Sequence, residues 1–468
     1  MRGLILSVTL LGFVLWAADW PTESGSPQRD GWAKSETTFT KDNVKGLELL
    51  YKYKADNQAK GQFALTTPLI NTRIITYLGF KEELVFGGSS DNVYAVDADL
   101  NRIIWKTHLP YKADKPPASS TALCPGGLTA PVIMNGSSTL AIARGGAGRA
   151  GRGLAGRGGL GRGEMIGPGR AAGMPRPANR SGEYYAVGSD GRLHTLNTST
   201  GADRVEPVRF LPPNSKVGAM NIADSAIYAA TLDNCGGNPN TLYAIDLASD
   251  DKKVVTFAGN VAGTAVGTDG TIYTQTHDAV FALAPKTLEV KDQFPLASSA
   301  ASVPVVFQWK GRDVIAAAGN DHVVLLDSKA LHTPISQAPG VFHGGFASWE
   351  DADSQTRWIY AITNKNVVGF KLDNDKIEKV WTSPEMNEPA PVVTANGLVF
   401  ALSTAGRATL HVLDGATGAE LYSSGNIAST YTRNSGLAVA NKRIYFTTHD
   451  NTVYCFGFLA EQPQLTGK

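Results

Sequence analysis

A net charge of one sign is lacking in this chain, which has 43 Lys and Arg residues against 42 Asp and Glu residues. No overall electrostatic field therefore holds the protein on nucleic acid or on an anionic membrane. Long apolar runs are also scarce, and the most apolar stretch, from Leu4 to Trp16, is too short for a comfortable membrane span. We expect no nucleic-acid partner, no membrane span and a monomeric protein.

Motifs of common catalytic and metal sites are missing as well. The sequence has no zinc-ligand spacing, no nucleotide-binding glycine loop and no nucleophile elbow. The run GGAGRAGRG matches loose glycine templates, but it belongs to a compositionally biased segment and does not open a helix. We therefore predict no metal site from the sequence.

The apolar run near the N-terminus has the layout of a secretory signal peptide. Arg2 precedes it, and the small residues Ala17 and Ala18 end it before the polar Asp19. The alternative, a buried N-terminal strand, explains the abrupt change of polarity less well. We expect residues 1–18 to be removed and the protein to be secreted or periplasmic.

Cysteine is rare, with only Cys124, Cys235 and Cys455 in 468 residues. Export makes one disulfide possible. Cys124 and Cys235 both lie in loops that contain Gly and Pro, whereas Cys455 lies within the apolar strand VYCFGF. We predict a Cys124–Cys235 disulfide and a buried Cys455 thiol, and the alternative of two unrelated loop thiols stays open.

One pattern recurs along the chain: an alternating strand that ends near Asp, a small turn, and a strand that often carries an aromatic residue. Three Asp-to-aromatic pairs have the same spacing of eight residues, namely Asp97 to Trp105, Asp373 to Trp381 and Asp414 to Tyr422. The marker positions along the chain are Asp97, Asn197, Asp246, Ala284, Asp327, Asp373, Asp414 and Gly457. Apart from the first step of 100 residues, their steps lie between 38 and 49 residues, which is typical of a four-stranded propeller blade.

The eighth copy of the repeat is one strand short, because only 11 residues follow Gly457. A suitable strand, LELLYKYK from Leu47 to Lys54, stands at the other end of the repeats. Pairing this strand into the last blade would close the ring and remove two open sheet edges. We predict an all-β, eight-bladed β-propeller closed by an N-terminal strand, rather than a β-sandwich pair, which would not produce a period near 43 residues.

The long first step contains a segment from Arg144 to Arg180 with eight arginines and one acidic residue, Glu164. Its glycine content and lack of apolar residues predict disorder. We expect either a tolerated low-complexity loop or a segment that binds polyanions. The predicted organisation is a signal peptide (1–18), an N-terminal extension (19–46), one propeller (47–460) with this insert at 144–180, and a tail (461–468).

The strands of the VLDGATGAELY type resemble the repeats of the pyrroloquinoline-quinone-binding-like (quinoprotein alcohol dehydrogenase-like) propeller superfamily. The segment DWPTESGSPQRDGW is similar to the stretch before the first blade in secreted bacterial members. The resemblance implies either a quinone- and calcium-dependent dehydrogenase or a scaffold such as the outer-membrane assembly lipoprotein. The adjacent cysteine pair that typically packs on the quinone in alcohol dehydrogenases of this group is absent here.

Functional residues are expected in the loops of one rim, where connections between blades meet the inner hairpin turns. Each candidate also has a structural explanation, such as capping a turn or packing a blade. The candidates are Asp233, Asn234, His343, Trp349, Glu385, Glu388, Arg433 and Asn434.

Two functions remain open at this stage. The first is an exported propeller that binds a small molecule or a protein on its loop-rich face, with an unknown cofactor requirement. The alternative is a dehydrogenase of alcohols or sugars that uses pyrroloquinoline quinone with calcium, in which Asp233 would accept the hydroxyl proton.

Overall fold

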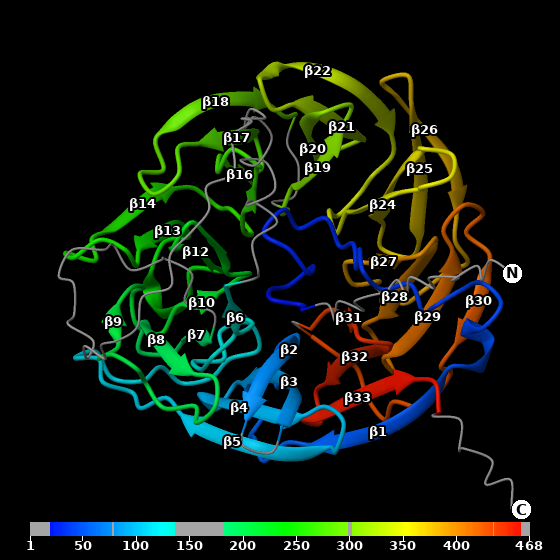
Figure 1. The fold of residues 1–468 in the computed structure, drawn as a ribbon. Helices are drawn as coiled ribbons and strands as arrows, with labels where there is room; N and C mark the ends of the chain where they lie inside the picture. The colour runs from blue at the N-terminus through cyan, green and yellow to red at the C-terminus, as the bar shows by residue number, and fades with distance from the viewer. Residues whose placement is uncertain (1–18, 77–78, 136–181, 298–301, 434, 460–468) are drawn as a thin grey trace, which may run out of the picture.

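Short antiparallel strands arranged in a ring account for nearly all regular structure in the computed structural model (Figure 1). The structure describes residues 19–76, 79–135, 182–297, 302–433 and 435–459. The expected signal peptide, the Arg/Gly insert and the C-terminal tail lie outside these residues. In the part of the chain that is described, no helix is long and apolar enough to cross a membrane.

Eight sheets form the blades, and each is ordered from the central channel outward. The first four blades are β2 (Leu69–Thr76), β3 (Gly79–Gly88), β4 (Asn92–Asp97) and β5 (Arg102–His108); β6 (Ile133–Met134), β7 (Glu183–Val187), β8 (Arg192–Asn197) and β9 (Val208–Arg209); β10 (Lys216–Val217) with β11 (Asn221–Ala223), β12 (Ala226–Leu232), β13 (Thr241–Asp246) and β14 (Val254–Ala258); and β15 (Ala265–Val266), β16 (Ile272–Gln275), β17 (Ala279–Leu283) and β18 (Val290–Pro295).

The other four blades complete the ring. They are β19 (Val305–Trp309), β20 (Arg312–Ala318), β21 (His322–Asp327) and β22 (Ala330–Pro339); β23 (Ala347–Glu350), β24 (Arg357–Ile362), β25 (Val367–Asp373) and β26 (Lys376–Thr382); β27 (Val393–Ala395), β28 (Leu398–Ser403), β29 (Thr409–Asp414) and β30 (Glu420–Ser423); and β31 (Ala438–Ala440), β32 (Arg443–Thr448) and β33 (Thr452–Gly457) with β1 (Glu48–Lys54) outermost.

The predicted eight-bladed propeller and its closure are confirmed. Strand β1 pairs antiparallel with β33, with Glu48 opposite Gly457 and Lys54 opposite Thr452. Each repeat marker stands at the end of the third strand of one blade or directly after it, as Asp97 does at the end of β4. These third strands are buried on both faces between neighbouring blades, which is why β4 and β33 read as almost continuous apolar runs.

The segment 19–39, which we call the channel segment, crosses the middle of the ring (Figure 1). It forms hydrogen bonds with each blade in chain order. The partner in each blade is the innermost strand or the turn that follows this strand. Trp20 pairs with Ile70 in the first blade, and the carbonyl oxygen of Asp30 accepts from Ser348 N in the sixth at 2.8 Å. In the eighth blade, Lys442 N donates to Glu36 at 2.6 Å. The predicted N-terminal extension is thus an ordered part of the propeller.

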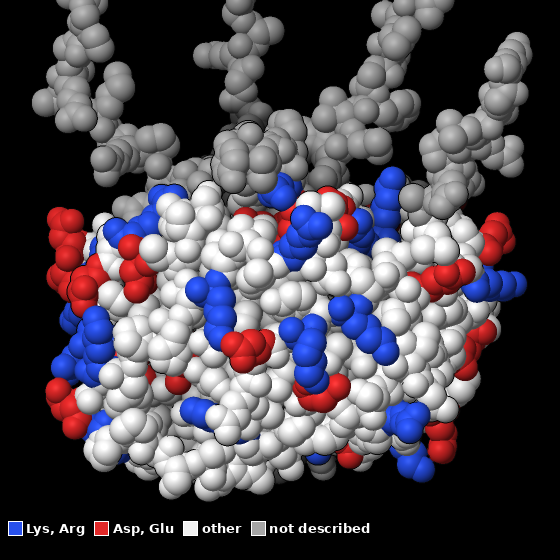
Figure 2. All heavy atoms as spheres, turned by 90° about the horizontal axis from the view of Figure 1, so that it is seen from below, with Lys and Arg blue, Asp and Glu red and all other residues white. Residues whose placement is uncertain are grey.

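Charged side chains are spread over the side of the ring. Lys and Arg residues lie among Asp and Glu residues in the view of Figure 2, without a broad field of one sign. This distribution agrees with the balanced composition of the sequence.

Candidate functional site

The two faces of the ring carry different loops because each blade is antiparallel. Connections between blades and the turns between second and third strands lie on one face, which we call the loop face. The turns between first and second strands and between third and fourth strands lie on the opposite face, which we call the turn face. Six of the seven sequence candidates that the structure describes belong to the loop face by this topology. Trp349 is the exception, because it lies within β23.

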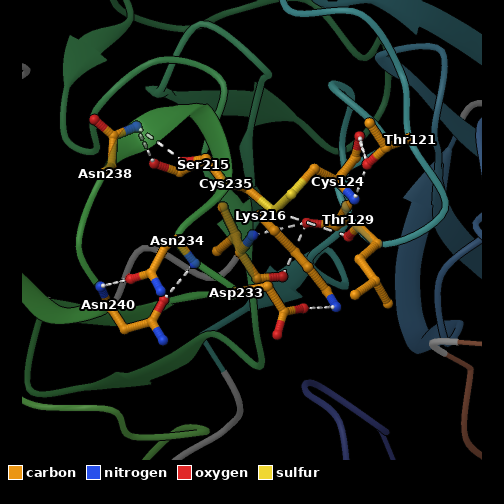
Figure 3. Close-up of a disulfide and its surroundings, with 12 residues drawn as sticks. Thr121, Cys124, Thr129, Ser215, Lys216, Asp233, Asn234, Cys235, Asn238 and Asn240 are labelled. Carbon is orange, nitrogen blue, oxygen red and sulfur yellow. Dashed lines mark hydrogen bonds and ion pairs between the residues drawn. A yellow bond between two sulfur atoms is a disulfide. The ribbon is translucent and has the colours of Figure 1, made fainter.

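A disulfide between Cys124 and Cys235 lies on the loop face (Figure 3), with the sulfur atoms 2.00 Å apart and the Cα atoms 5.5 Å apart. Cys124 belongs to the connection between the first and second blades, and Cys235 to the turn between β12 and β13. The bridge therefore ties the long connection 109–132 to the third blade. Cys455 is a buried free thiol, and burial raises its pKa to about 12.

Asp233 and Asn234 stand beside this disulfide and serve the turn that carries it. The Asp233 carboxylate forms an ion pair with Lys216 (Figure 3). Asn234 and Asn240 exchange backbone-to-side-chain hydrogen bonds of 2.9 and 3.2 Å. Neither residue lines the central cavity. Asp233 is thus held by a cation in the turn that carries the disulfide, outside the central cavity.

The central cavity of the loop face has a volume of about 200 Å³. Its walls come from the chain directly before several innermost strands, including Ala262, Val303 and Phe346. His343 lines it and is exposed, and its backbone N donates to Ile362 O at 3.0 Å. Of the sequence candidates that the structure describes, His343 is the one that lines this cavity.

The channel segment forms the floor of the central cavity through Glu23, Ser24 and Arg29. Arg29 is 3% exposed, and burial lowers the pKa of its guanidinium. Its nitrogen atoms donate to the carbonyl oxygens of Glu23, Met220 and Thr264 at 2.7, 2.6 and 3.3 Å. These bonds make Arg29 a clamp that fixes the floor. No motif marked it in the sequence, because its role comes from carbonyls of distant blades.

Among the remaining candidates, the structure brings Glu388 and Arg433 into contact. Glu385 pairs with Lys365 at 3.5 Å and Glu388 with Arg433 at 3.8 Å, and all four side chains are exposed. Trp349 lies on β23 opposite Trp358 and packs on apolar residues between the sixth and seventh blades. We expected Trp349 on the loop rim, and this prediction is wrong. Trp349 lies within the innermost strand of its blade, on the side of the turn face. Asn434 lies outside the described residues.

A pyrroloquinoline quinone with calcium does not fit the residues of the central cavity. Among the described residues that line it, Glu23 is the one carboxylate, and it forms an ion pair with Arg29 at 3.7 Å. Among the described residues, no group of three or more His, Cys, Asp or Glu side chains could hold a metal ion. The floor guanidinium, which would have to meet the acidic quinone, already donates to three carbonyls.

Comparison with known proteins finds similarity at the level of structure. No family model and no curated protein matches the sequence. The quinohemoprotein alcohol dehydrogenase from Comamonas testosteroni is 14% identical over 96% of this chain and 82% of its own, with a TM-score of 0.60. A europium-containing methanol dehydrogenase is 11% identical over 94% and 98%, with a TM-score of 0.61.

BamB from Moraxella catarrhalis is also similar, at 15% identity over 89% of this chain and 99% of its own, with a TM-score of 0.53. Identities this low indicate a shared fold and leave the activity open. The resemblance carried by the repeats is therefore confirmed at the level of the fold: the chain is an eight-bladed propeller of the type found in pyrroloquinoline-quinone-dependent dehydrogenases.

Proposed function

We propose that the chain is an exported binding propeller whose loop face holds a protein partner, with one partner side chain inserted in the central cavity. The observation that carries this proposal is the closed channel. Because the channel segment forms a fixed floor, the cavity keeps only about 200 Å³. Pockets for drug-sized molecules typically have about 300–1,000 Å³. The cavity is better suited to one large side chain than to a cofactor.

The surroundings of the cavity support a protein partner. Its lining is mostly apolar, with Val303, Val305 and Phe346, while the Glu385–Lys365 and Glu388–Arg433 pairs belong to the surrounding loop face. An apolar centre inside a polar rim is the usual anatomy of a protein interface. Export is supported by the apolar run before Asp19 and by the Cys124–Cys235 bridge, because disulfides persist in oxidising compartments.

Peptide selection tests the partner proposal. Displayed peptides would be selected on the chain from Asp19 to Lys468, and their affinity would be measured again on Ala262→Phe, which fills the cavity from a half-buried position. We expect a loss of at least tenfold. The matched control is Ala248→Phe, on an exposed turn of the opposite face, which should bind as the parent does. Equal affinity for both variants would refute insertion into the cavity.

The dehydrogenase alternative has its own test. The protein would be mixed with the quinone and calcium, and both cofactor absorbance and reduction of an electron-acceptor dye with alcohols and sugars would be recorded. We expect neither signal, because the lining lacks a calcium ligand set. Dye reduction that depends on the quinone would replace the binding proposal with catalysis.

A further inference from the structure

A second cavity, which we call the turn-face cavity, lies on the other side of the channel segment. It has a volume of about 280 Å³ and is lined by the channel segment and by residues of the fourth, fifth and sixth blades. Its blade residues stand at the ends of innermost strands or the starts of second strands, which places it on the turn face. It shares no lining residue with the central cavity. The side chains that argue for a ligand are Asp30, Trp32, Lys34, Gln308, Asp313 and Arg357.

One wall of this cavity is a guanidinium held between two aromatic rings. Arg357 is 3% exposed, and its Cζ lies 5.6 Å from the Trp32 ring and 5.5 Å from the Phe307 ring. Nη2 donates to Gln308 O at 2.7 Å and pairs with Glu350, whereas the buried Nε has no hydrogen-bond partner. A buried donor without a partner is costly, and the contacts with the two rings help to hold the guanidinium in place.

The charges around the cavity are already paired. Lys34 binds Asp30 at 2.8 Å, and Arg357 binds Glu350. Asp313 accepts from the backbone N and the hydroxyl of Thr268 at 2.7 and 2.9 Å, and also from Gln308 Nε2. The lining therefore offers many donors and acceptors but no uncompensated cation for an anionic ligand.

Charged ligands are disfavoured for a second reason. An anion would meet the carboxylates of Asp30, Asp313 and Glu350, which line the same space. A cation would meet Lys34, whose Nζ lies 5.2 Å from the centre of the Trp32 ring, and Arg357 near that ring. Like charges in partly desolvated sites repel. A neutral molecule with many hydroxyl groups is repelled neither by the carboxylates nor by the cations of the cavity.

We propose that the turn-face cavity is a binding site for a neutral sugar of hexose size. One C–H face of the pyranose ring would pack on the half-buried Trp32, from which the half-exposed Lys34 side chain can move away. Gln308 Nε2 donates to Asp313, and the sugar hydroxyls would bind at this pair, accepting from the second amide hydrogen of Gln308 and donating to the Asp313 carboxylate. The apolar ring face and polar edges of a sugar match this aromatic wall with its polar margin. This site is additional to the partner site on the loop face.

Three sugars with the same ring and different charge test the proposal: glucose, glucuronate and glucosamine, with galactose and mannose as further neutral probes. Binding to the chain from Asp19 to Lys468 would be measured by calorimetry and ligand-observed NMR. We expect at least one neutral hexose to bind with a millimolar or lower dissociation constant and to exceed its charged counterparts by at least tenfold. No binding of any neutral hexose at several millimolar would overturn the proposal, and so would tighter binding of glucuronate or glucosamine.

Variants locate the site. Trp32→Leu and Gln308→Ala should each weaken hexose binding at least tenfold, while Gln293→Ala, a matched change at an exposed position of β18, should leave it unchanged. Gln308→Ala keeps the backbone carbonyl that Arg357 binds but removes the side-chain bond to Asp313, so the melting transitions of both variants would be compared with that of the parent. Hexose binding that persists in a folded Gln308→Ala protein would exclude this cavity as the site.

Discussion

The acidic and aromatic positions of the repeat act together across neighbouring blades. Asp414 Oδ1 accepts from the backbone N atoms of Ala416 and Thr417 at 2.8 and 3.1 Å, which caps the turn after β29. Trp381 of the preceding blade donates from Nε1 to Gly415 O in the same turn at 3.0 Å. Gly418 has φ +72°, and a Cβ there would lie 2.5 Å from the Trp381 ring. The tryptophan of one blade therefore packs on the Thr-Gly turn of the next blade.

Replacing this tryptophan should weaken the junction between the sixth and seventh blades. Trp381→Phe removes the bond to Gly415 O and leaves ring volume unfilled at a position that is 7% exposed. We expect a loss of about 2 kcal/mol in the free energy of unfolding, measured by chemical denaturation. Val380→Ala, on the exposed face of the same strand, should change it by less than about 0.5 kcal/mol. Equal effects of the two changes would show that the tryptophan contact is unimportant.

Glu82 and Glu83 are neighbouring buried carboxyl groups on β3. Burial raises the pKa of Glu82 to about 7 and that of Glu83 to about 7, from an ordinary value of 4.5. Tyr184 donates to Glu83 at 2.7 Å, and Arg443 lies 3.7 Å from Glu82. These partners do not offset the desolvation, so both groups bind protons more tightly in the folded state.

This shift predicts a pH dependence of stability. Between pH 4.5 and 7 the folded protein keeps protons that the unfolded chain has released, so stability falls as pH rises through this window. Each carboxyl contributes up to about 3 kcal/mol. Chemical denaturation at pH 5 and pH 8 should show a smaller difference for Glu82→Gln with Glu83→Gln than for the parent. An unchanged difference would contradict the raised pKa values.

At the scale of elements, β1 and the channel segment join the N-terminus to the whole ring. A chain that begins at residue 61 lacks both, whereas a chain that begins at Leu47 keeps β1. We expect the melting temperature, measured by calorimetry, to be highest for the Asp19 start, lower for the Leu47 start and lowest for the residue 61 start. The Leu47 start loses the channel bonds, and the residue 61 start also loses the β1–β33 pairing. A residue 61 start that melts within a degree or two of the parent would contradict closure by β1.

The Arg/Gly insert remains a prediction from composition, since it lies outside the described residues. The described chain on its two sides, β6 and β7, pairs within the second blade. Replacing Arg144 to Arg180 with a short Gly/Ser linker should leave the melting transition unchanged, because the segment has little apolar surface to bury. Binding to heparin should decrease. If that binding does not depend on salt, the arginines have no electrostatic role.

At the scale of the whole molecule, the disulfide joins parts of the chain that are 111 residues apart. Closing a loop of this length should stabilise the fold by roughly 3–5 kcal/mol through the unfolded state. We expect Cys124→Ala with Cys235→Ala to lose that amount, measured by denaturation of protein made in an oxidising compartment. Peptide mapping without reductant provides the direct check, and recovery of both cysteines as free thiols would eliminate the bridge.

The ring, its number of blades and its closure could all be predicted from the sequence. Repeat periodicity is a local signal, because each blade needs the same turn, strand and aromatic residue. The Asp-to-aromatic spacing of eight residues lies within one blade, and Trp381, eight residues after Asp373, packs on the Asp414 turn of the next blade. The place of Cys124 and Cys235 on one face also follows, since blade topology decides which loops share a face.

Only the tertiary structure decided how the channel is divided. Arg29 and Trp32 belong to a segment without repeat signature, and their partners Met220, Thr264 and Arg357 are hundreds of residues away. The sequence candidates were chosen by residue type in loops, so the Glu385 and Glu388 side chains proved to be surface ion pairs. The two cavities form where one strand-like segment meets the ends of different blades. No local sequence pattern predicts these contacts between the channel segment and the blades, because they form only when the ring is closed.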